Sequence, residues 1–186
     1  LLTVVLNWRT PDMTILAAEA ALREMAGIPG ALTIVDNDSG DGSFEKMTAE
    51  VAAHGWNAGP HRVRVLQSGR NGGFGAGNNV GIRAGLPDGT RPDYVFILNS
   101  DAFPVKGSIR ALIDHLESHP ATGFAGSFIE EDWSSPDLVE LLKVFIANRG
   151  AVESAIYGSW WGSLLYRVKH LLNGNSRRGS RKNIHA

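Results

Sequence analysis

The chain has 186 residues, a formal net charge of −1 and a hydrophobic content of 43%. This size and composition indicate one globular domain with its own core, and no run approaches the roughly 20 consecutive apolar residues of a membrane-spanning helix. The sequence contains no cysteine, which excludes disulfide bridges and thiolate metal sites.

Up to residue 128, short apolar runs alternate with segments of helical periodicity. The apolar runs show no clean alternation with polar residues, which predicts strands that are covered on both faces. We expect these strands at residues 2–6, 32–35, 63–66, 94–98 and 123–128.

Four helices are expected between these strands. The first begins at Thr10-Pro11-Asp12, which offers an N-cap, a proline for the first turn and an early acid, and Gly27 can end it. The second begins at Asp41 or Ser43 and ends near His54. The other two are expected at about 75–84 and 106–119.

The repeated order of strand, helix and strand predicts an α/β fold with a mostly parallel sheet and helices on both faces. Ligands of such sheets bind beyond the carboxyl ends of the strands. Later in the chain, 136–148 is predicted as an amphipathic helix, and the apolar residues of 153–172 also fall at helical spacing. The expected parts of the chain are an α/β domain at 1–128, a helical extension at 129–173 that packs on or near the sheet, and a flexible basic tail at 174–186.

Polar residues follow the first two predicted strands. Asn7 and Arg9 end the first strand, where an ordinary turn explains them equally well. Asp36 comes directly after the second strand, and its carboxylate can accept a hydrogen bond from a base N–H or a ribose hydroxyl. Asp38 and Asp41, further along, fit turn or capping roles instead.

A glycine-rich run occupies residues 71–81, after the third strand. Five glycines in eleven residues let a backbone approach a ligand closely, and the N-terminus of the following helix favours anions. The run fits neither the dinucleotide fingerprint G-x-G-x-x-G nor a P-loop. Its paired asparagines, Asn78 and Asn79, add donors and acceptors, so the run is typical of a ligand-binding loop.

Asp101 follows the fourth strand, within Asn99-Ser100-Asp101. A carboxylate at that edge can bind Mg²⁺ or Mn²⁺, which prefer oxygen ligands and often share a site with phosphates. The ion would neutralise charge on a departing diphosphate. The alternative is that Asp101 only caps a helix that begins near Pro104.

Taken together, four motifs resemble the family 2 glycosyltransferases, which have the GT-A nucleotide-diphospho-sugar transferase fold. The likeness is closest to bacterial rhamnosyltransferase-like members that build surface polysaccharides. The motifs follow the family's order over about residues 2–128, and they are Val4-Val5-Leu6-Asn7-Trp8, the run from Val35 to Ser43, the run from Asn71 to Arg83, and Leu98-Asn99-Ser100-Asp101.

The resemblance implies a metal-dependent, inverting transfer of a sugar from a UDP- or dTDP-sugar to a glycan or lipid-linked acceptor. Asp36 would contact the uracil or thymine. Asp101 would bind Mg²⁺ or Mn²⁺ in the family's Asp-x-Asp-type motif, in which Asn99 replaces the first acid. The residues expected to contact the donor are Asn7, Arg9, Asp36, Asn71, Gly72, Gly75, Asn78 and Asn99.

The acceptor half of the chain is expected to be short. Family members continue into a segment with a catalytic-base carboxylate, often in a Glu-Asp pair, and the one acidic cluster after residue 128 is Glu130-Glu131-Asp132. Glu131 and Asp132 are therefore the candidate bases. The expectation is an enzyme that is either truncated or uses a shortened acceptor region. The alternative is a nucleotide-sugar-binding remnant or subunit without turnover. A nucleotidyltransferase would need a basic glycine-rich loop near the N-terminus, and residues 1–30 contain none.

Residues 167–186 carry six Lys or Arg and no acid, which suits an anionic partner such as a membrane surface or nucleic acid. The apolar segment 156–172 with its basic end fits either an interfacial helix or a helix that covers the sheet. A peripheral membrane contact through 156–182 is therefore one open alternative, and no nucleic-acid partner is expected. The expected location is the cytoplasm, extending to the inner face of the membrane.

Overall fold

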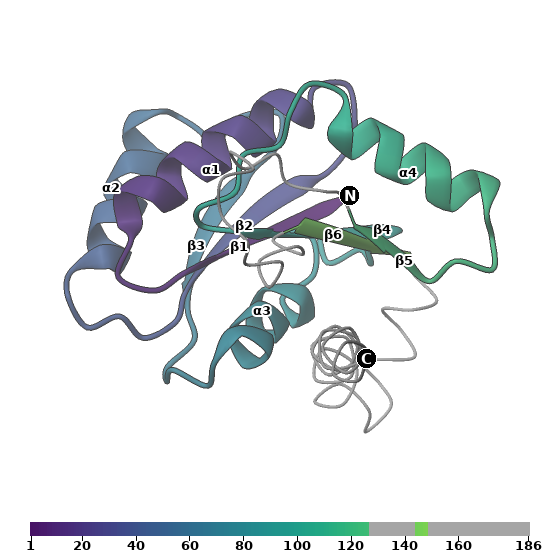
Figure 1. Cartoon of the computed structure of the whole chain (residues 1–186). Coiled ribbons are helices and arrows are strands. Elements are labelled where there is room, and N and C mark those ends of the chain that lie inside the picture. The colour runs from purple at the N-terminus through teal and green to yellow at the C-terminus, as the bar shows by residue number, and fades with distance from the viewer. Residues whose placement is uncertain (127–143, 149–186) are drawn as a thin grey trace, which may run out of the picture.

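A six-stranded sheet forms the centre of the protein (Figure 1). The structure, a computed structural model, describes residues 1–126 and 144–148. The strand order is β3-β2-β1-β4-β6-β5. The strands are β1 (Leu2–Asn7), β2 (Ala31–Asp36), β3 (Val63–Gln67), β4 (Tyr94–Asn99), β5 (Phe124–Gly126) and β6 (Val144–Asn148).

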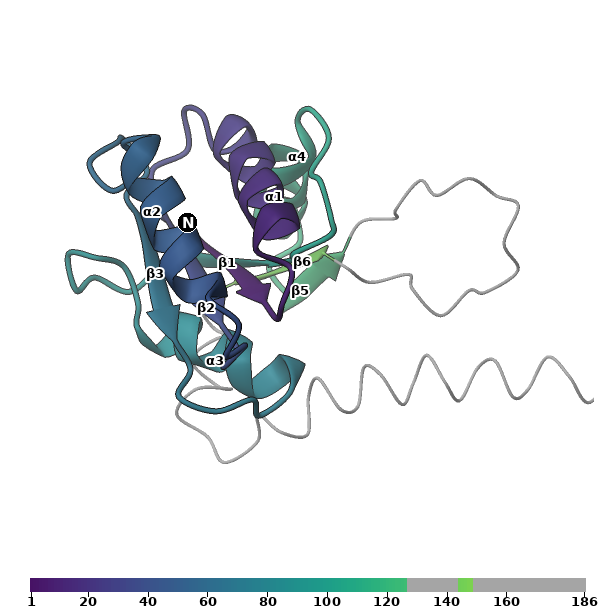
Figure 2. The same cartoon turned by 90° about the vertical axis from the view of Figure 1, so that its left-hand side faces the viewer.

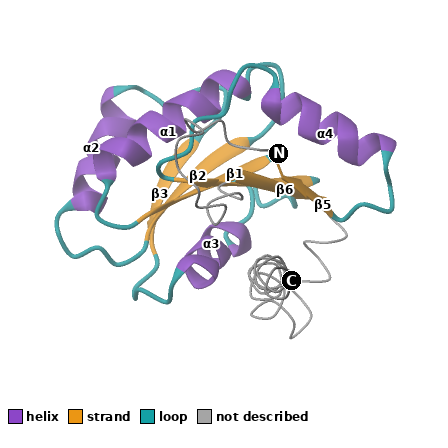
Figure 3. Cartoon of the chain, viewed as in Figure 1, coloured by secondary structure: helices purple, strands orange, loops and turns teal. Residues whose placement is uncertain are grey.

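The first four strands are parallel, whereas β6 runs antiparallel to β4 and β5 runs antiparallel to β6. Three helices cover one face of the sheet and α3 covers the other, as Figure 2 and Figure 3 show from two directions. The helices are α1 (Pro11–Glu24), α2 (Ser43–Ala53), α3 (Phe74–Arg83) and α4 (Ser108–Ser118). The predicted α/β class, the mostly parallel sheet and the four helices are thereby confirmed. Within the described residues, no helix combines the length and apolar character needed to cross a membrane.

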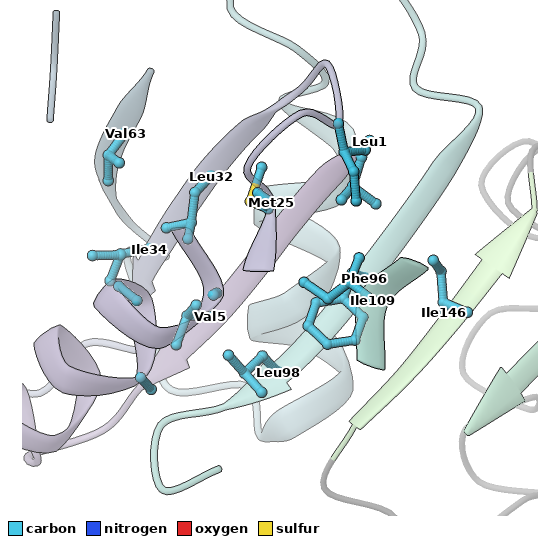
Figure 4. Close-up of a cluster of buried hydrophobic side chains, with 14 of the residues drawn as sticks. Leu1, Val5, Met25, Leu32, Ile34, Val63, Phe96, Leu98, Ile109 and Ile146 are labelled. Atoms are coloured by element: carbon cyan, nitrogen blue, oxygen red, sulfur yellow. The ribbon is translucent and has the colours of Figure 1, made fainter. Parts of the chain in front are cut away.

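The strands separate two hydrophobic cores, because successive side chains of a strand point to opposite faces. Val5, Phe96 and Leu98 face α1, α2 and α4 in the larger cluster, part of which Figure 4 shows. The alternate residues Val4 and Ile97 pack on the other face, with Ile82 of α3. Every residue of β1 and β2 is buried, which explains why these runs are mostly apolar and do not alternate with exposed polar residues.

The predicted helix at 136–148 is wrong for its last residues, because 144–148 form β6 beside β4. The sequence Val-Phe-Ile-Ala-Asn is rich in β-branched and aromatic residues. Without β6, the edge of β4 would present a row of unpaired backbone groups. Pairing within the sheet therefore overrides the helical spacing. The rest of that predicted helix and residues 149–186 lie outside the described residues, and the division of the chain at 128 and 173 stays a prediction.

Helix α3 lies close to the sheet because Gly77 and Gly81, one turn apart, face it. A Cβ added at Gly77 would lie 2.5 Å from Leu6 Cδ1. One added at Gly81 would lie 2.7 Å from Val4 Cγ1 and 3.0 Å from Val35 Cγ2. Two of the glycines that indicated a ligand-binding loop therefore serve the packing of a helix on the sheet.

Replacing Gly81 by alanine is expected to lower the free energy of unfolding by about 1–2 kcal/mol. Overpacking against two stiff valine side chains, with a contact as short as 2.7 Å, should cost about 2–3 kcal/mol, in the upper part of the usual range, and the better helix propensity of alanine offsets about 1 kcal/mol of it. Urea denaturation measures the change. Gly59→Ala is the control, since its added Cβ would come no closer than 3.7 Å to the nearest backbone atoms. A Gly81→Ala variant as stable as the wild type would contradict the close packing of α3.

Candidate functional site

The carboxyl ends of β1, β2 and β4 bring the predicted residues to one edge of the sheet. Asn7 and Asp36 are register partners on neighbouring strands, and Asn99 pairs with Leu6 on the other side of β1. The chain leaves β1 toward β2 but leaves β4 toward the opposite end of the sheet. Open α/β sheets bind ligands at the point where the strand order reverses in this way.

Asp36 is completely buried and closes the turn that follows β2. Its Oδ1 accepts hydrogen bonds from Asn7 Nδ2 at 2.7 Å and from Ser39 Oγ at 2.5 Å. Its Oδ2 accepts one from the Ser39 N–H at 3.1 Å. A carboxylate without such partners would be expensive to bury, so this loop depends on Asn7 and Ser39.

The Ser39 hydroxyl uses its full hydrogen-bonding capacity of one donor and two acceptors within this network. It donates to Asp36, and it accepts from Asn7 Nδ2 at 3.2 Å and from the Arg9 N–H at 2.9 Å. Arg9 Nε also donates to the Ser39 carbonyl at 3.1 Å. The segments after β1 and β2 are thus one hydrogen-bonded unit.

Asn7 connects this unit to the start of helix α1. Its Oδ1 accepts hydrogen bonds from Thr14 Oγ1 at 2.8 Å and from the Thr10 N–H at 3.2 Å. The side chain is buried, and both ends of its amide are in use within the protein. In this arrangement Asn7 positions its neighbours and joins β1, α1 and the loop after β2.

Arg9 and Asp38 have positive φ angles of 59° each, which is unusual for residues other than glycine. The Arg9 guanidinium lies 5.3 Å from the centre of the exposed Trp8 ring. Asp41 accepts hydrogen bonds from the Ser43 N–H and hydroxyl in the turn before α2, while Gly42 occupies the N-cap position. The hydroxyl bond is the main reason that the pKa of Asp41 is lowered, and the charge of Arg9 adds to it.

The glycine-rich run contacts the loop after β2 through two asparagines. Asn71 Oδ1 accepts from the Gly73 N–H and from Asn37 Nδ2, both at 3.0 Å. A backbone N–H can only donate, so the Asn71 oxygen must face Gly73, and Asn37 must then offer its amide nitrogen. Asn37 Oδ1 is left buried without a partner. Asn37 was not among the predicted site residues, and its place beside Asp36 was the signal in the sequence.

Further acceptors at this edge have no donor. Asn78 Nδ2 donates to the Phe74 carbonyl at 2.9 Å, which leaves its buried Oδ1 unpartnered. Asn79 Oδ1 and Asn99 Oδ1 are also buried without a hydrogen bond. Buried acceptors of this kind indicate a place for donors from a ligand or from ordered water.

The two glycines predicted to contact the donor lie in different places near the start of α3. Gly72 precedes α3, where an added Cβ would lie 2.7 Å from Ala76 Cβ, and Gly75 lies in the first turn of the helix. Gly73, between them, has a positive φ of 82°. The chain therefore turns sharply into α3 at Gly73, and Asn71, just before this turn, is hydrogen-bonded to Asn37.

Asp101 is exposed on the turn after β4. Helix α4 begins only at Ser108, so the alternative that Asp101 caps it is wrong. The neighbouring Ser100 Oγ is hydrogen-bonded to Thr10 Oγ1 at 3.3 Å, and Thr10 makes no side-chain cap of α1. This bond joins the segment that carries Asp101 to the segment after β1.

The edge suits a metal ion that takes few ligands from protein. Among the described residues, no group of three or more His, Cys, Asp or Glu side chains lies together. Mg²⁺ and Mn²⁺ in nucleotide sites commonly take one or two carboxylates and fill the rest of their shell with phosphate oxygens and water. Asp101 fits such a role. Glu131 and Asp132, the candidate bases, lie outside the described residues.

Comparisons with known proteins agree with this geometry. A family model described as glycosyl transferase family 2 matches residues 30–176. No curated protein is similar enough in sequence to count as a relative.

Two solved structures share the fold. A mannosyltransferase from Pyrobaculum calidifontis in complex with GDP-mannose and Mn²⁺ matches with a TM-score of 0.64 and 13% identity, over 82% of this chain and 45% of that one. Residues 1–349 of S. aureus TarS with UDP-GlcNAc match with a TM-score of 0.55 and 14% identity, over 73% of this chain and 36% of that one. The chain therefore spans less than half the length of either structure.

At such identities the likeness concerns the fold, and the fold is the GT-A type that the motifs predicted. The family model covers most of the chain, including the loop after β2, the glycine-rich run and the segment of Asp101. The chain belongs to glycosyl transferase family 2.

Proposed function

We propose that the carboxyl edge of the sheet binds a nucleoside-diphosphate sugar and that the chain carries the donor half of a glycosyltransferase. The observation that carries the proposal is the joining of three strand ends by hydrogen bonds, with unpartnered amide oxygens among them. The complexes of the two similar structures with GDP-mannose and UDP-GlcNAc support this class of ligand. UDP- and dTDP-sugars, rhamnosyl donors included, remain the proposed donors.

The nucleobase is expected against the loop after β2. The resemblance assigns the base contact to Asp36, whose two oxygens already accept three hydrogen bonds within the protein. Asn37 is the next residue and offers a buried oxygen without a donor. We propose that Asp36 holds the loop in shape and that a base N–H bonds to Asn37, whose buried oxygen becomes accessible as the ligand binds. A direct contact with Asp36 would instead require its existing hydrogen bonds to break.

Asp101 is proposed to bind Mg²⁺ or Mn²⁺ together with the diphosphate. Bound there, the ion would supply Lewis-acid stabilisation of the leaving diphosphate. Asp101 itself holds a negative charge at the exposed end of β4, next to the segment after β1. The structure of the similar mannosyltransferase with Mn²⁺ supports a divalent cation at this type of site.

In the proposed inverting reaction, a carboxylate takes the proton of an acceptor hydroxyl, whose oxygen then attacks the anomeric carbon as the bond to the diphosphate breaks. Glu131 and Asp132 stay the candidate bases. A glycan or lipid-linked acceptor in polysaccharide synthesis is the proposed acceptor, and the lipid-linked case would bring a cytoplasmic enzyme to the inner face of the membrane. The competing proposal is a module that binds the nucleotide sugar without turnover.

Asp101→Asn is expected to abolish the part of nucleotide binding that depends on Mn²⁺. UDP, dTDP and GDP are compared by thermal shift, with and without Mn²⁺. A nucleotide at 100 times its dissociation constant adds about 2.7 kcal/mol to stability, or about 5–10 °C for a domain of this size. Asp114→Asn, an exposed carboxylate change on α4, is the control.

An undiminished Mn²⁺ effect in Asp101→Asn would overturn the metal assignment. Hydrolysis of the matching nucleotide sugar by the purified chain separates the two proposed functions. Turnover in the wild type that Asp101→Asn loses favours the enzyme, and binding without turnover favours the module.

Asn37→Ala is expected to weaken binding of the same nucleotide by about tenfold, the value of one hydrogen bond in a buried site. Its melting temperature should stay near that of the wild type, since the loss of the hydrogen bond to Asn71 is offset by the removal of a buried oxygen that lacks a donor. Asp36→Asn should instead destabilise the protein by about 1–3 kcal/mol, because an amide has one oxygen and its NH2 group cannot accept a hydrogen bond, whereas both carboxylate oxygens of Asp36 accept one. Isothermal titration and urea denaturation measure the two effects. Full affinity in Asn37→Ala would return the base contact to Asp36.

A further inference from the structure

Arg9 occupies a backbone conformation that is costly for its residue type. Its φ angle of 59° lies in the left-handed region, which glycine enters freely and asparagine more easily than other residues. Non-glycine residues in this region persist where the surrounding structure holds them, and they gather at functional sites. The chain keeps a long cationic side chain where a smaller residue would be less strained, which points to a use for the guanidinium.

Neighbouring groups hold the inner part of Arg9 in place. The backbone N–H donates to Ser39 Oγ and Nε donates to the Ser39 carbonyl. The guanidinium stacks against Trp8. Its charge acts on Asp41 without an ion pair, and among the described residues its two Nη atoms have neither a hydrogen bond nor a salt bridge.

Arg9 also stands between the two halves of the proposed donor site. On one side, Ser39 ties it to the loop that carries Asp36 and Asn37. On the other side, the next residue, Thr10, is hydrogen-bonded to Ser100, which precedes Asp101. A donor whose base lies at the loop after β2 and whose diphosphate lies near Asp101 must pass Arg9.

We propose that Arg9 binds the diphosphate of the donor through its Nη atoms. A guanidinium presents planar N–H donors that match phosphate oxygens and keeps its charge at any relevant pH. Because Nε is held by Ser39, the two Nη groups are already oriented and lose little freedom on binding. The inference rests on the proposed donor site, and it assigns to Arg9 a phosphate contact separate from the base contact.

The test compares a nucleoside diphosphate with its own nucleoside. The pair is taken from the nucleotide that stabilises the wild type most, among UDP, dTDP and GDP, and affinities are measured by ligand-observed NMR without divalent metal. Arg9→Asn removes the charge but keeps a residue that tolerates positive φ. It should weaken the diphosphate by about 10- to 100-fold, as expected for a charge-assisted contact, and leave the nucleoside within about twofold. Arg9→Lys should restore part of the loss, because it keeps the charge without the planar fork.

Two further readouts distinguish binding from structural support. The melting temperature of Arg9→Asn should stay within about 3 °C of the wild type, since relief of the left-handed strain offsets the lost Ser39 contact. The dependence of diphosphate affinity on salt should also become shallower, because one charged contact is gone. Arg83→Asn, an exposed arginine at the end of α3, is the control and should change neither affinity.

The outcomes separate the inference from the proposed function. If a nucleoside diphosphate binds and Arg9→Asn leaves its affinity unchanged, the phosphate contact is overturned and the donor site stands. If Arg9→Asn weakens the diphosphate and the nucleoside equally, Arg9 shapes the nucleoside site and the phosphate assignment is again overturned. If none of the three diphosphates binds the wild type with or without Mn²⁺, the donor site itself fails and the inference fails with it.

Discussion

The burial of the Asp36 carboxylate is the constraint on which the candidate site depends. A charge at the end of a buried strand has to be given hydrogen bonds, because leaving it without them would cost more than most single interactions contribute. Asn7 and Ser39 provide those bonds. In doing so they fix the loop after β2 against the end of β1. The positive φ of Arg9 and the position of its side chain follow from the same contacts.

This constraint divides the polar residues of the edge into two groups. Asn7, Asp36 and Ser39 have their hydrogen-bonding groups engaged by one another and by α1, so they act as a frame. Asn37 and Asn78 each keep an oxygen without a donor. The proposed ligand contacts belong to the second group, while the first group keeps them in position. A substitution in the frame is therefore expected to change stability, and one outside it to change affinity.

The close packing of the helices on the sheet also shapes this edge. Gly77 and Gly81 let α3 approach β1 and β2 closely, and this approach brings Asn78 and the run from Asn71 next to the loop after β2. β6 completes the other side of the sheet by pairing with β4. β4 is thereby an inner strand that is paired on both sides. Asn99 is its last residue, and Asp101 lies in the turn that follows.

The sequence by itself was enough to determine the α/β class, the first four strands, the four helices and the family, because apolar periodicity, capping residues and motif order are local or ordered along the chain. It also placed Asp36 and Asp101 at the ends of buried strands. Only the tertiary structure decided that 144–148 is a strand, since an open edge beside β4 selects it. The tertiary structure alone likewise showed that Asp36 is saturated and Asn37 is not, because hydrogen-bond partners up to 34 residues apart decide which polar atoms remain for a ligand. The pattern along a chain indicates which residues reach the edge of the sheet, whereas their availability there depends on neighbours that only folding brings together.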